Sequence, residues 1–275
     1  MLDIKTMRPK DLARALDWAA EEGWNPGLDD AAAFYRADPE GFLMGWLGDE
    51  PVSSISVIRH NRDFAFLGLY ICRAEYRGQG YGWQTWQAGM ARADNCVIGL
   101  DGVVAQQANY AKSGFAFDHR TFRYEGVVPP ARHPAARGSG AAATALEIDR
   151  AVTGMPRLPY LGAWFTDTDT RKTRLIRTKS GGRALGTIRA CGDGHKVGPL
   201  YASEPDLARD LLADLADCAG ATRVILDVPE TNSAAVELAE ALGMVRSFET
   251  ARMYKGAAPQ RDEKSVFGEV TLELG

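Results

Sequence analysis

The sequence has few cysteines, no long apolar run and no strong excess of charge. Four cysteines occur among 275 residues. They lie far apart, without a Cys-x-x-Cys or Cys/His ligand spacing: Cys72, Cys96, Cys191 and Cys218. This distribution predicts reduced thiols and no metal site. No stretch of about 18 consecutive apolar residues occurs, which argues against a membrane-spanning helix.

The charge balance and the first residues narrow the functional class. With 32 basic and 36 acidic residues the formal net charge is -4, unlike the basic footprint of a general nucleic-acid-binding protein. The sequence opens Met-Leu-Asp-Ile-Lys, without an apolar signal core. We therefore expect a cytoplasmic protein with neither nucleic acid nor membrane as a partner, and leave a homodimer open.

Residues 127–144 have the composition of a linker. They include three prolines and two glycines and almost no side chain large enough for a core. The linker divides the chain into a first domain at residues 1–126 and a second at residues 145–275. Each is near the usual domain size.

Both halves alternate strand and helix patterns in a similar order. In the first half we predict strands at 2–7, 42–47, 52–58, 64–72, 96–100 and 115–124, and helices at 9–22, 83–93 and 106–112. In the second we predict strands at 171–178, 183–189, 195–201, 224–228 and 248–254, helices at 204–219 and 233–242, and an alternating tail strand at 265–274. The repeated order predicts a duplicated α/β architecture.

Alternating glycines follow the predicted strand 64–72 and lead into the predicted helix 83–93. The run is Arg77-Gly78-Gln79-Gly80-Tyr81-Gly82-Trp83. Glycines let successive backbone N–H groups turn toward one point, and the helix adds its positive end, so the loop suits a diphosphate. A Rossmann fingerprint would need glycine at Trp83 and a Walker loop would end in Gly-Lys-Ser/Thr, so neither fits. A structural turn without a ligand is the alternative.

The spacing Arg-Gly-x-Gly-x-Gly resembles motif A of the GCN5-related N-acetyltransferases (GNAT), in which this loop cradles the pyrophosphate of coenzyme A. The later run Asn109-Tyr110-Ala111-Lys112-Ser113-Gly114-Phe115 resembles that family's asparagine, tyrosine and Gly-Phe signature. The resemblance implies that Tyr110 protonates the departing thiolate, which a phenol still protonated at pH 7 can do. A helix-end tyrosine packed on the sheet is the alternative.

The resemblance covers nearly all of the first half and, in diverged form, the second. It implies a mixed α/β (α+β) fold of two tandem GNAT-like domains, each a central, mostly antiparallel sheet flanked by helices. The second half has Ala202-Ser203-Glu204-Pro205-Asp206 at the loop and Ala239 at the tyrosine position. Because its carboxylates would repel a diphosphate, we expect this half to wall the acceptor pocket or support the first domain instead of binding coenzyme A.

The resemblance further implies direct acetyl transfer from acetyl-CoA, used as co-substrate, to the primary amine of a small-molecule acceptor. The pantetheine arm is expected to pair with the strand ending at residues 71–73, where a backbone N–H would face the developing oxyanion. The predicted coenzyme-binding residues are Ile71, Cys72, Arg73, Arg77, Gly78, Gln79, Gly80, Tyr81, Gly82, Trp83 and Asn109. A non-catalytic acyl-CoA sensor and a protein acetylase are the alternatives.

Transfer also needs a base that takes a proton from the ammonium form of the acceptor. The sequence leaves five candidates open: Glu22, His60, Asp63, Glu75 and Asp101. Trp24 and Tyr70 could shape the acceptor pocket. Cys72 belongs to an apolar strand and is expected to be a packing residue, not a nucleophile.

Overall fold

The computed structural model describes residues 1–130 and 141–275, and one continuous sheet of twelve strands runs through them. The strands are β1 (Asp3–Thr6), β2 (Phe42–Leu47), β3 (Glu50–Arg59), β4 (Phe64–Cys72), β5 (Val97–Val103), β6 (Ala116–Gly126), β7 (Arg171–Arg177), β8 (Arg183–Ala190), β9 (His195–Ala202), β10 (Val224–Pro229), β11 (Val245–Lys255) and β12 (Val266–Gly268). Their order is β1-β2-β3-β4-β5-β11-β6-β10-β9-β8-β7, with β12 paired to β9. Among the strands of the described residues, only the pairs β4–β5 and β9–β10 are parallel.

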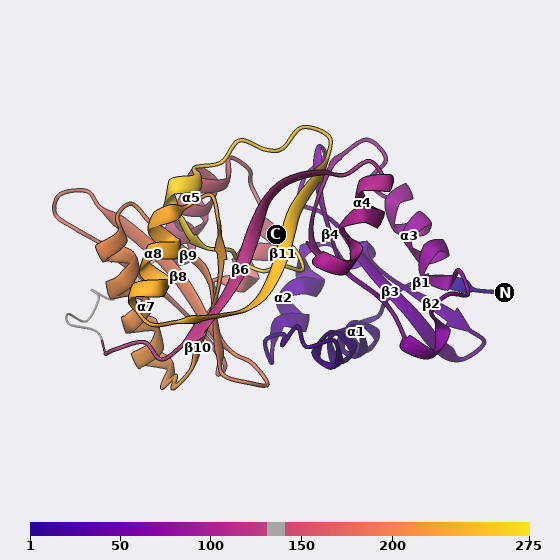
Figure 1. The fold of residues 1–275 in the computed structure, drawn as a ribbon, viewed down its shortest axis with the longest axis horizontal. Coiled ribbons are helices and arrows are strands. Elements are labelled where there is room, and N and C mark those ends of the chain that lie inside the picture. Colours follow the sequence, from indigo (N-terminus) through magenta and orange to yellow (C-terminus); the bar gives the residue numbers. More distant parts are fainter. Residues whose placement is uncertain (131–140) are drawn as a thin grey trace.

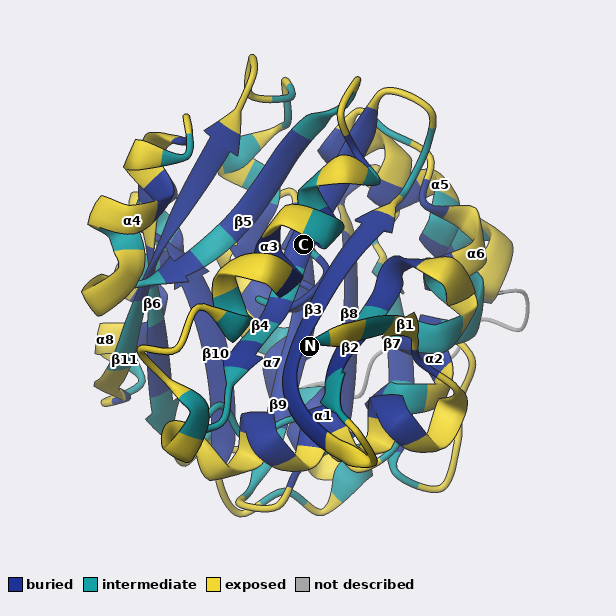
Figure 2. Ribbon diagram, turned by 90° about the vertical axis from the view of Figure 1, so that its right-hand side faces the viewer, coloured by how far each residue is buried: buried dark blue, intermediate teal, exposed yellow. Residues whose placement is uncertain are grey.

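The helices cover the sheet with one face and expose the other, as the colours of Figure 2 show. They are α1 (Pro9–Glu21), α2 (Asp30–Ala37), α3 (Tyr81–Ala91), α4 (Gln107–Lys112), α5 (Ala141–Thr153), α6 (Leu158–Trp164), α7 (Pro205–Ala219) and α8 (Ser233–Ala241). Among the described residues, no helix is both long enough and apolar enough to cross a bilayer.

The last long strand of each half is exchanged with the other half. β11 pairs with β5 of the first half, while β6 pairs with β10 of the second, and the two exchanged strands pair with each other. Figure 1 shows β6 and β11 crossing the middle of the molecule side by side. As in domain swapping between subunits, each half therefore completes its sheet with a strand from the other.

The hydrophobic cores follow this exchange. The core under α3 includes Ala251 and Met253 of β11, and the core under α7 and α8 includes Tyr124 of β6. A third core lies between the halves, where α1 and α2 pack with α5, α6 and the tail residues Val270 and Leu274. The two halves thus share their apolar interior, and the sheet joins them across the exchanged strands.

The structure departs from the predicted elements in three helices and in the tail. Helices α2, α5 and α6 were not predicted. The predicted tail strand 265–274 is wrong beyond β12, since residues 272–274 form a turn. Residues 266–271 are all buried, polar and apolar alike, so the alternation does not mark one solvent-facing side of a strand. Of the predicted linker, residues 131–140 lie outside the described residues and 141–144 begin α5. The domain boundaries at 126 and 145 stay predictions.

Candidate active site

A cavity of about 380 Å³ lies where the two halves meet. The first half contributes the end of β4, the end of β5, Tyr110 of α4, and Glu22 and Trp24 after α1. The exchanged strands contribute Arg123 of β6 and Phe248 and Thr250 of β11. The tail contributes Leu272 and Glu273. The cavity is therefore built by segments that are distant in the sequence.

One end of the cavity lies in an opening between β4 and β5. These parallel strands pair only over residues 64–67 and 97–100. Beyond Leu67, β4 continues to Cys72 with no strand partner on that side in the described chain. A register shift against β3 accompanies a left-handed backbone at Leu69, with φ of 45°; such a bulge bends a strand away from its neighbour. The free edge of β4 can accept an extended ligand as an added strand.

The glycine loop follows this edge and leads into α3. Gly78 and Gly80 have φ of 76° and 82°, a left-handed conformation that glycine adopts without strain. The residues Gly78, Gln79 and Gly80 are exposed, and their amides bond no backbone carbonyl within the described residues. Tyr81, Gly82 and Trp83 form the first turn of α3, where helical N–H groups lack partners inside the helix. This arrangement is competent to bind an anion.

Tyr110 is both packed and able to reach a ligand. It is 8% exposed, stacks on Trp86 with ring centroids 5.5 Å apart, and lines the cavity. Burial raises the pKa of Tyr110 well above its ordinary value, and burial also raises the pKa of the neighbouring Tyr70 to about 12. Tyr110 therefore stays protonated at neutral pH and can donate a proton into the cavity.

Contacts mostly from the second half hold in place the loop after α1, which contributes Trp24 to the cavity wall. The carbonyl oxygen of Trp24 accepts hydrogen bonds from Lys196 at 2.7 Å and from Arg123 at 3.1 Å. Asp30, at the start of α2, contacts Arg171 at 2.9 Å and Arg189 at 3.2 Å. Burial opposes ionisation of Asp30, but the two arginines outweigh it and lower its pKa. The loop from Trp24 to Asp30 is thus anchored by buried, charge-assisted contacts.

The tail passes directly against β4. A Cβ atom added at Gly68 would lie 2.0 Å from the carbonyl oxygen of Glu273, so only glycine allows this approach. Nε2 of His60 lies 2.7 Å from the carbonyl oxygen of Leu274 and donates to it. Sequence reasoning did not find Leu272 or Glu273 as site residues, because the alternating pattern indicated only another strand.

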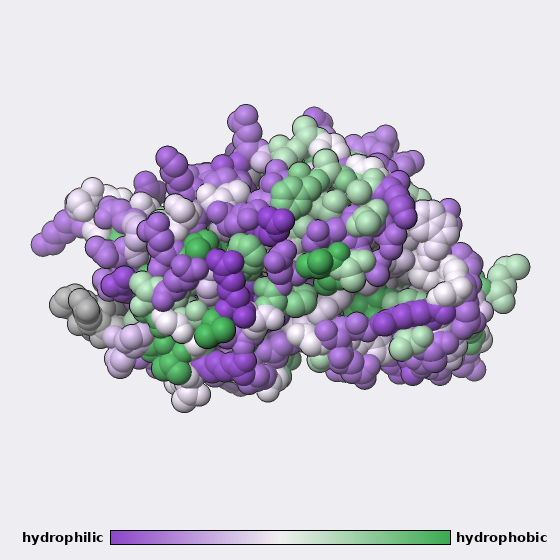
Figure 3. All heavy atoms as spheres, in the orientation of Figure 1, coloured by the Kyte–Doolittle hydropathy of each residue, from purple (hydrophilic) through white to green (hydrophobic). Residues whose placement is uncertain are grey.

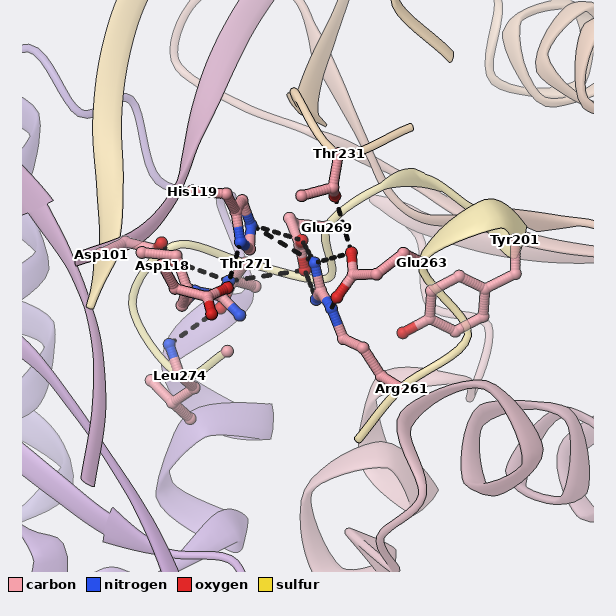
Figure 4. A network of polar contacts seen from close by, with 12 residues as sticks. Asp101, Asp118, His119, Tyr201, Thr231, Arg261, Glu263, Glu269, Thr271 and Leu274 are labelled. Carbon is pink, nitrogen blue, oxygen red and sulfur yellow. Dashed lines mark hydrogen bonds and ion pairs between the residues drawn. The ribbon is translucent and has the colours of Figure 1, made fainter. Parts of the chain in front are cut away.

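A buried ionic network holds the tail at this position (Figure 4). Glu269 lies 2.7 Å from Arg261 and 3.4 Å from Arg252, and Arg252 binds Asp101 through two contacts of 2.8 Å. Burial opposes ionisation of Glu269, but Arg261 and Arg252 outweigh it and hold its pKa well below the ordinary value. Because Asp101 belongs to β5 and Arg252 to β11, the network joins the tail to both halves.

The predicted coenzyme-binding residues divide into three groups. Ile71, Cys72 and Arg77 line the cavity together with Tyr110. The residues from Gly78 to Trp83 lie next to it, in the loop and the first turn of α3. The other two make local contacts: Arg73 pairs with Glu50 and with Glu75, and the amide of exposed Asn109 donates at 2.9 Å to Gln106, which lines the cavity.

Two of the five candidate bases, Glu22 and Asp101, line the cavity. Glu22 is ion-paired with Arg77, and Asp101 is held by both nitrogens of the Arg252 fork. Burial of the imidazole, and secondly the positive charge of Arg157, lower the pKa of His60 to about 3. His60 contacts the tail at Leu274. Asp63 pairs with Arg62 and Glu75 with Arg73, neither along the cavity wall. Among the described residues, no group of three or more potential metal ligands occurs.

Comparisons with known proteins agree on the family in both halves. The model of the acetyltransferase (GNAT) family matches residues 10–115, and that of an acetyltransferase (GNAT) domain matches residues 145–268. Holothin acyltransferase from Pseudoalteromonas sp. (strain SANK 73390) is 31% identical over 264 residues, which are 94% of this chain and 90% of that protein.

Solved structures share the fold over nearly the whole chain. A putative acetyltransferase from Pyrococcus horikoshii aligns with a TM-score of 0.80 at 21% identity, covering 100% of this chain and 96% of that one. A tandem GNAT protein from the clavulanic acid biosynthesis pathway aligns with a TM-score of 0.61 at 11% identity, covering 94% and 99%. The predicted mixed α/β fold with two tandem GNAT-like domains is confirmed.

Proposed function

Because this chain belongs to the GNAT family of acyltransferases, with two tandem GNAT domains, we propose that it transfers an acetyl group from acetyl-CoA directly to the primary amine of a small molecule. The glycine loop would hold the coenzyme diphosphate, and the free edge of β4 at Ile71 and Cys72 would pair with the pantetheine arm.

The observation that carries this proposal is the cavity that joins the open edge of β4 to Tyr110. In direct transfer the amine nitrogen attacks the thioester carbon, the C–S bond breaks, and Tyr110 gives its proton to the departing sulfur. An acyl-enzyme on Cys72 is disfavoured, because burial raises the pKa of that thiol and a thiol is a weaker nucleophile than a thiolate.

The walls of the cavity support a small acceptor over a polypeptide. The anchored Trp24 loop, the tail at Glu273 and the exchanged strand at Phe248 all line the cavity and limit its volume. Figure 3 shows one outer face of the molecule covered mostly by hydrophilic side chains, with hydrophobic ones in separate groups. The relative with 31% identity is a holothin acyltransferase, so holothin is the first acceptor to test.

The test is a transfer assay with the purified chain. Acetyl-CoA, propionyl-CoA and butyryl-CoA are each offered with holothin, with alkylamines such as benzylamine and with arylamines such as aniline, and free thiol and product mass are followed. We expect amine-dependent release of CoA and an N-acetyl product. If calorimetry shows acetyl-CoA binding but no amine causes release of CoA, the sensor hypothesis would replace the enzyme hypothesis.

A further inference from the structure

Three carboxylates line the cavity, and two of them are already occupied. Glu22 is paired with Arg77, and Asp101 is held by Arg252. The third is Glu273, in a residue only 5% exposed. Among the described residues, its carboxylate forms no ion pair or hydrogen bond. A buried carboxylate is costly unless a partner stabilises it, so this position is suited to receive a cation from the ligand.

We propose that Glu273 is the catalytic base of this site, binding the ammonium group of the acceptor and removing one of its protons. This inference rests on the proposed function. The freed nitrogen lone pair forms the C–N bond and the C–S electron pair leaves with sulfur. Tyr110 protonates that sulfur and recovers a proton from the new amide nitrogen, while Glu273 returns its proton to water.

A second observation identifies another polar group on the cavity wall. Thr250 of β11 lines the cavity and is 2% exposed, and its hydroxyl has no hydrogen-bond partner among the described residues. A buried hydroxyl without a partner costs roughly 1–3 kcal/mol. A polar atom of a bound acceptor would remove that cost, so Thr250 joins Glu273 as a cavity-lining group without a partner among the described residues.

The charged groups around Glu273 are committed to other partners. The charge of Glu273 acts on Arg123, Arg189 and Lys196. Arg123 is bound by Asp227 through contacts of 2.8 and 2.9 Å, Arg189 meets Asp30, and Lys196 donates to the carbonyl of Trp24. None of the three cations forms an ion pair or hydrogen bond with the Glu273 carboxylate within the described residues.

The backbone around Glu273 is fixed well enough for a catalytic role. Its carbonyl lies against Gly68, its neighbour Leu274 accepts from His60, and the preceding Glu269 is held by Arg252 and Arg261. A reacting group held by packing and ionic contacts on both sides loses little entropy when it acts.

The experiment compares Glu273→Gln and Glu273→Asp with Glu237→Gln, a control on the exposed side of α8. Each variant is assayed with benzylamine, which is protonated at neutral pH, and aniline, which is not. We expect Glu273→Gln to lower kcat/KM about 100-fold or more for benzylamine, with a much smaller loss for aniline and unchanged affinity for acetyl-CoA. Its benzylamine rate should rise with pH about tenfold per unit, because free amine must now come from solution, and Glu273→Asp should retain part of the activity.

Two results would overturn the assignment while leaving the proposed function intact. One is a wild-type enzyme that acetylates amines with Glu273→Gln equally active. The other is an equal loss for both amines accompanied by weaker acetyl-CoA binding, which would mark Glu273 as structural. A wild type that binds acetyl-CoA but acetylates no amine would instead reject the proposed function, and the base role with it.

Discussion

At Tyr110, packing and chemistry make compatible demands on one side chain. The stacked contact with Trp86 fixes the ring, and burial raises the pKa of the phenol, so the proton stays in place across the working pH range. We predict that Tyr110→Phe, which keeps the packing, lowers kcat by about 100-fold and leaves the Kd for acetyl-CoA nearly unchanged. Steady-state kinetics and calorimetry check both halves of this statement; an unchanged kcat would remove Tyr110 from the proton transfer.

At Gly80, the prediction tests the effect of an added negative charge, with the strain of a left-handed backbone controlled for separately. Gly80→Asp would place an anion among the amides proposed for the diphosphate, and binding of acetyl-CoA should be largely abolished. Gly48→Asp is the matched control, because Gly48 is also left-handed, with φ of 62°, and nothing lies within 4 Å of its added Cβ. Calorimetry on both variants separates the effects. Equal loss, or no loss in either, would show that the loop does not bind the coenzyme.

Residues of local motifs could be predicted from the sequence, and residues brought in by topology could not. The glycine loop and Tyr110 each lie within a recognisable local motif, so both could be predicted from the sequence. Glu273 and Thr250 enter the cavity from segments more than 130 positions after Tyr110, and neither carries a motif. Arg73 pairs with Glu50 and Glu75, and its role in coenzyme binding stays a prediction.

Among the elements, the tail after β12 depends on Glu269. Glu269→Gln would leave Arg252 and Arg261 without their shared anion, and breaking a buried pair in this way costs about 3–5 kcal/mol. We predict a loss of that size in chemical denaturation, with Glu237→Gln close to wild type. Destabilisation below about 1 kcal/mol would show that the network does not hold the tail.

The same residue predicts the direction of acid sensitivity. The pKa of Glu269 is lower in the folded chain than in the unfolded chain, so its stabilisation is complete above the ordinary glutamate pKa of about 4.3 and is lost as the pH falls below it. Unfolding free energy followed from pH 7 to pH 3 should fall for the wild type and fall less steeply for Glu269→Gln. Parallel profiles would contradict the assignment.

Strand periodicity located β6 and β11 but not their exchange. Alternation with a period of two residues indicates which face of a strand is buried, but not which strands are its neighbours. Pairing within the same half and pairing with the other half would bury the same residues of β6 and β11. The exchange is decided by neighbours far away in the sequence, including Asp101 against Arg252 across β5 and β11 and Arg123 against Asp227 across β6 and β10.

For the whole molecule, the exchange predicts that the halves cannot separate. After cleavage at a protease site inserted between residues 130 and 141, the two pieces should elute together on size exclusion, because each half of the sheet contains a strand of the other piece. They should part only in denaturant. Separation under native conditions would contradict the shared sheet and the shared core.

At this scale the second half supplies part of the cavity wall, and we expect no second coenzyme site in it. It provides Phe248, Thr250, Leu272 and Glu273 to the cavity and anchors the Trp24 loop through Lys196. In its own copy of the loop position Pro205 begins α7 with no preceding glycine, and buried Ala239 stands at the tyrosine position.

A crystal structure of the complex with acetyl-CoA tests the central claim most directly. The account predicts one coenzyme per chain, with its diphosphate on the amides of residues 78–82, its pantetheine arm along β4 at Ile71 and Cys72, and its thioester between Tyr110 and Glu273. A coenzyme bound in the second half, or a thioester outside this cavity, would contradict it.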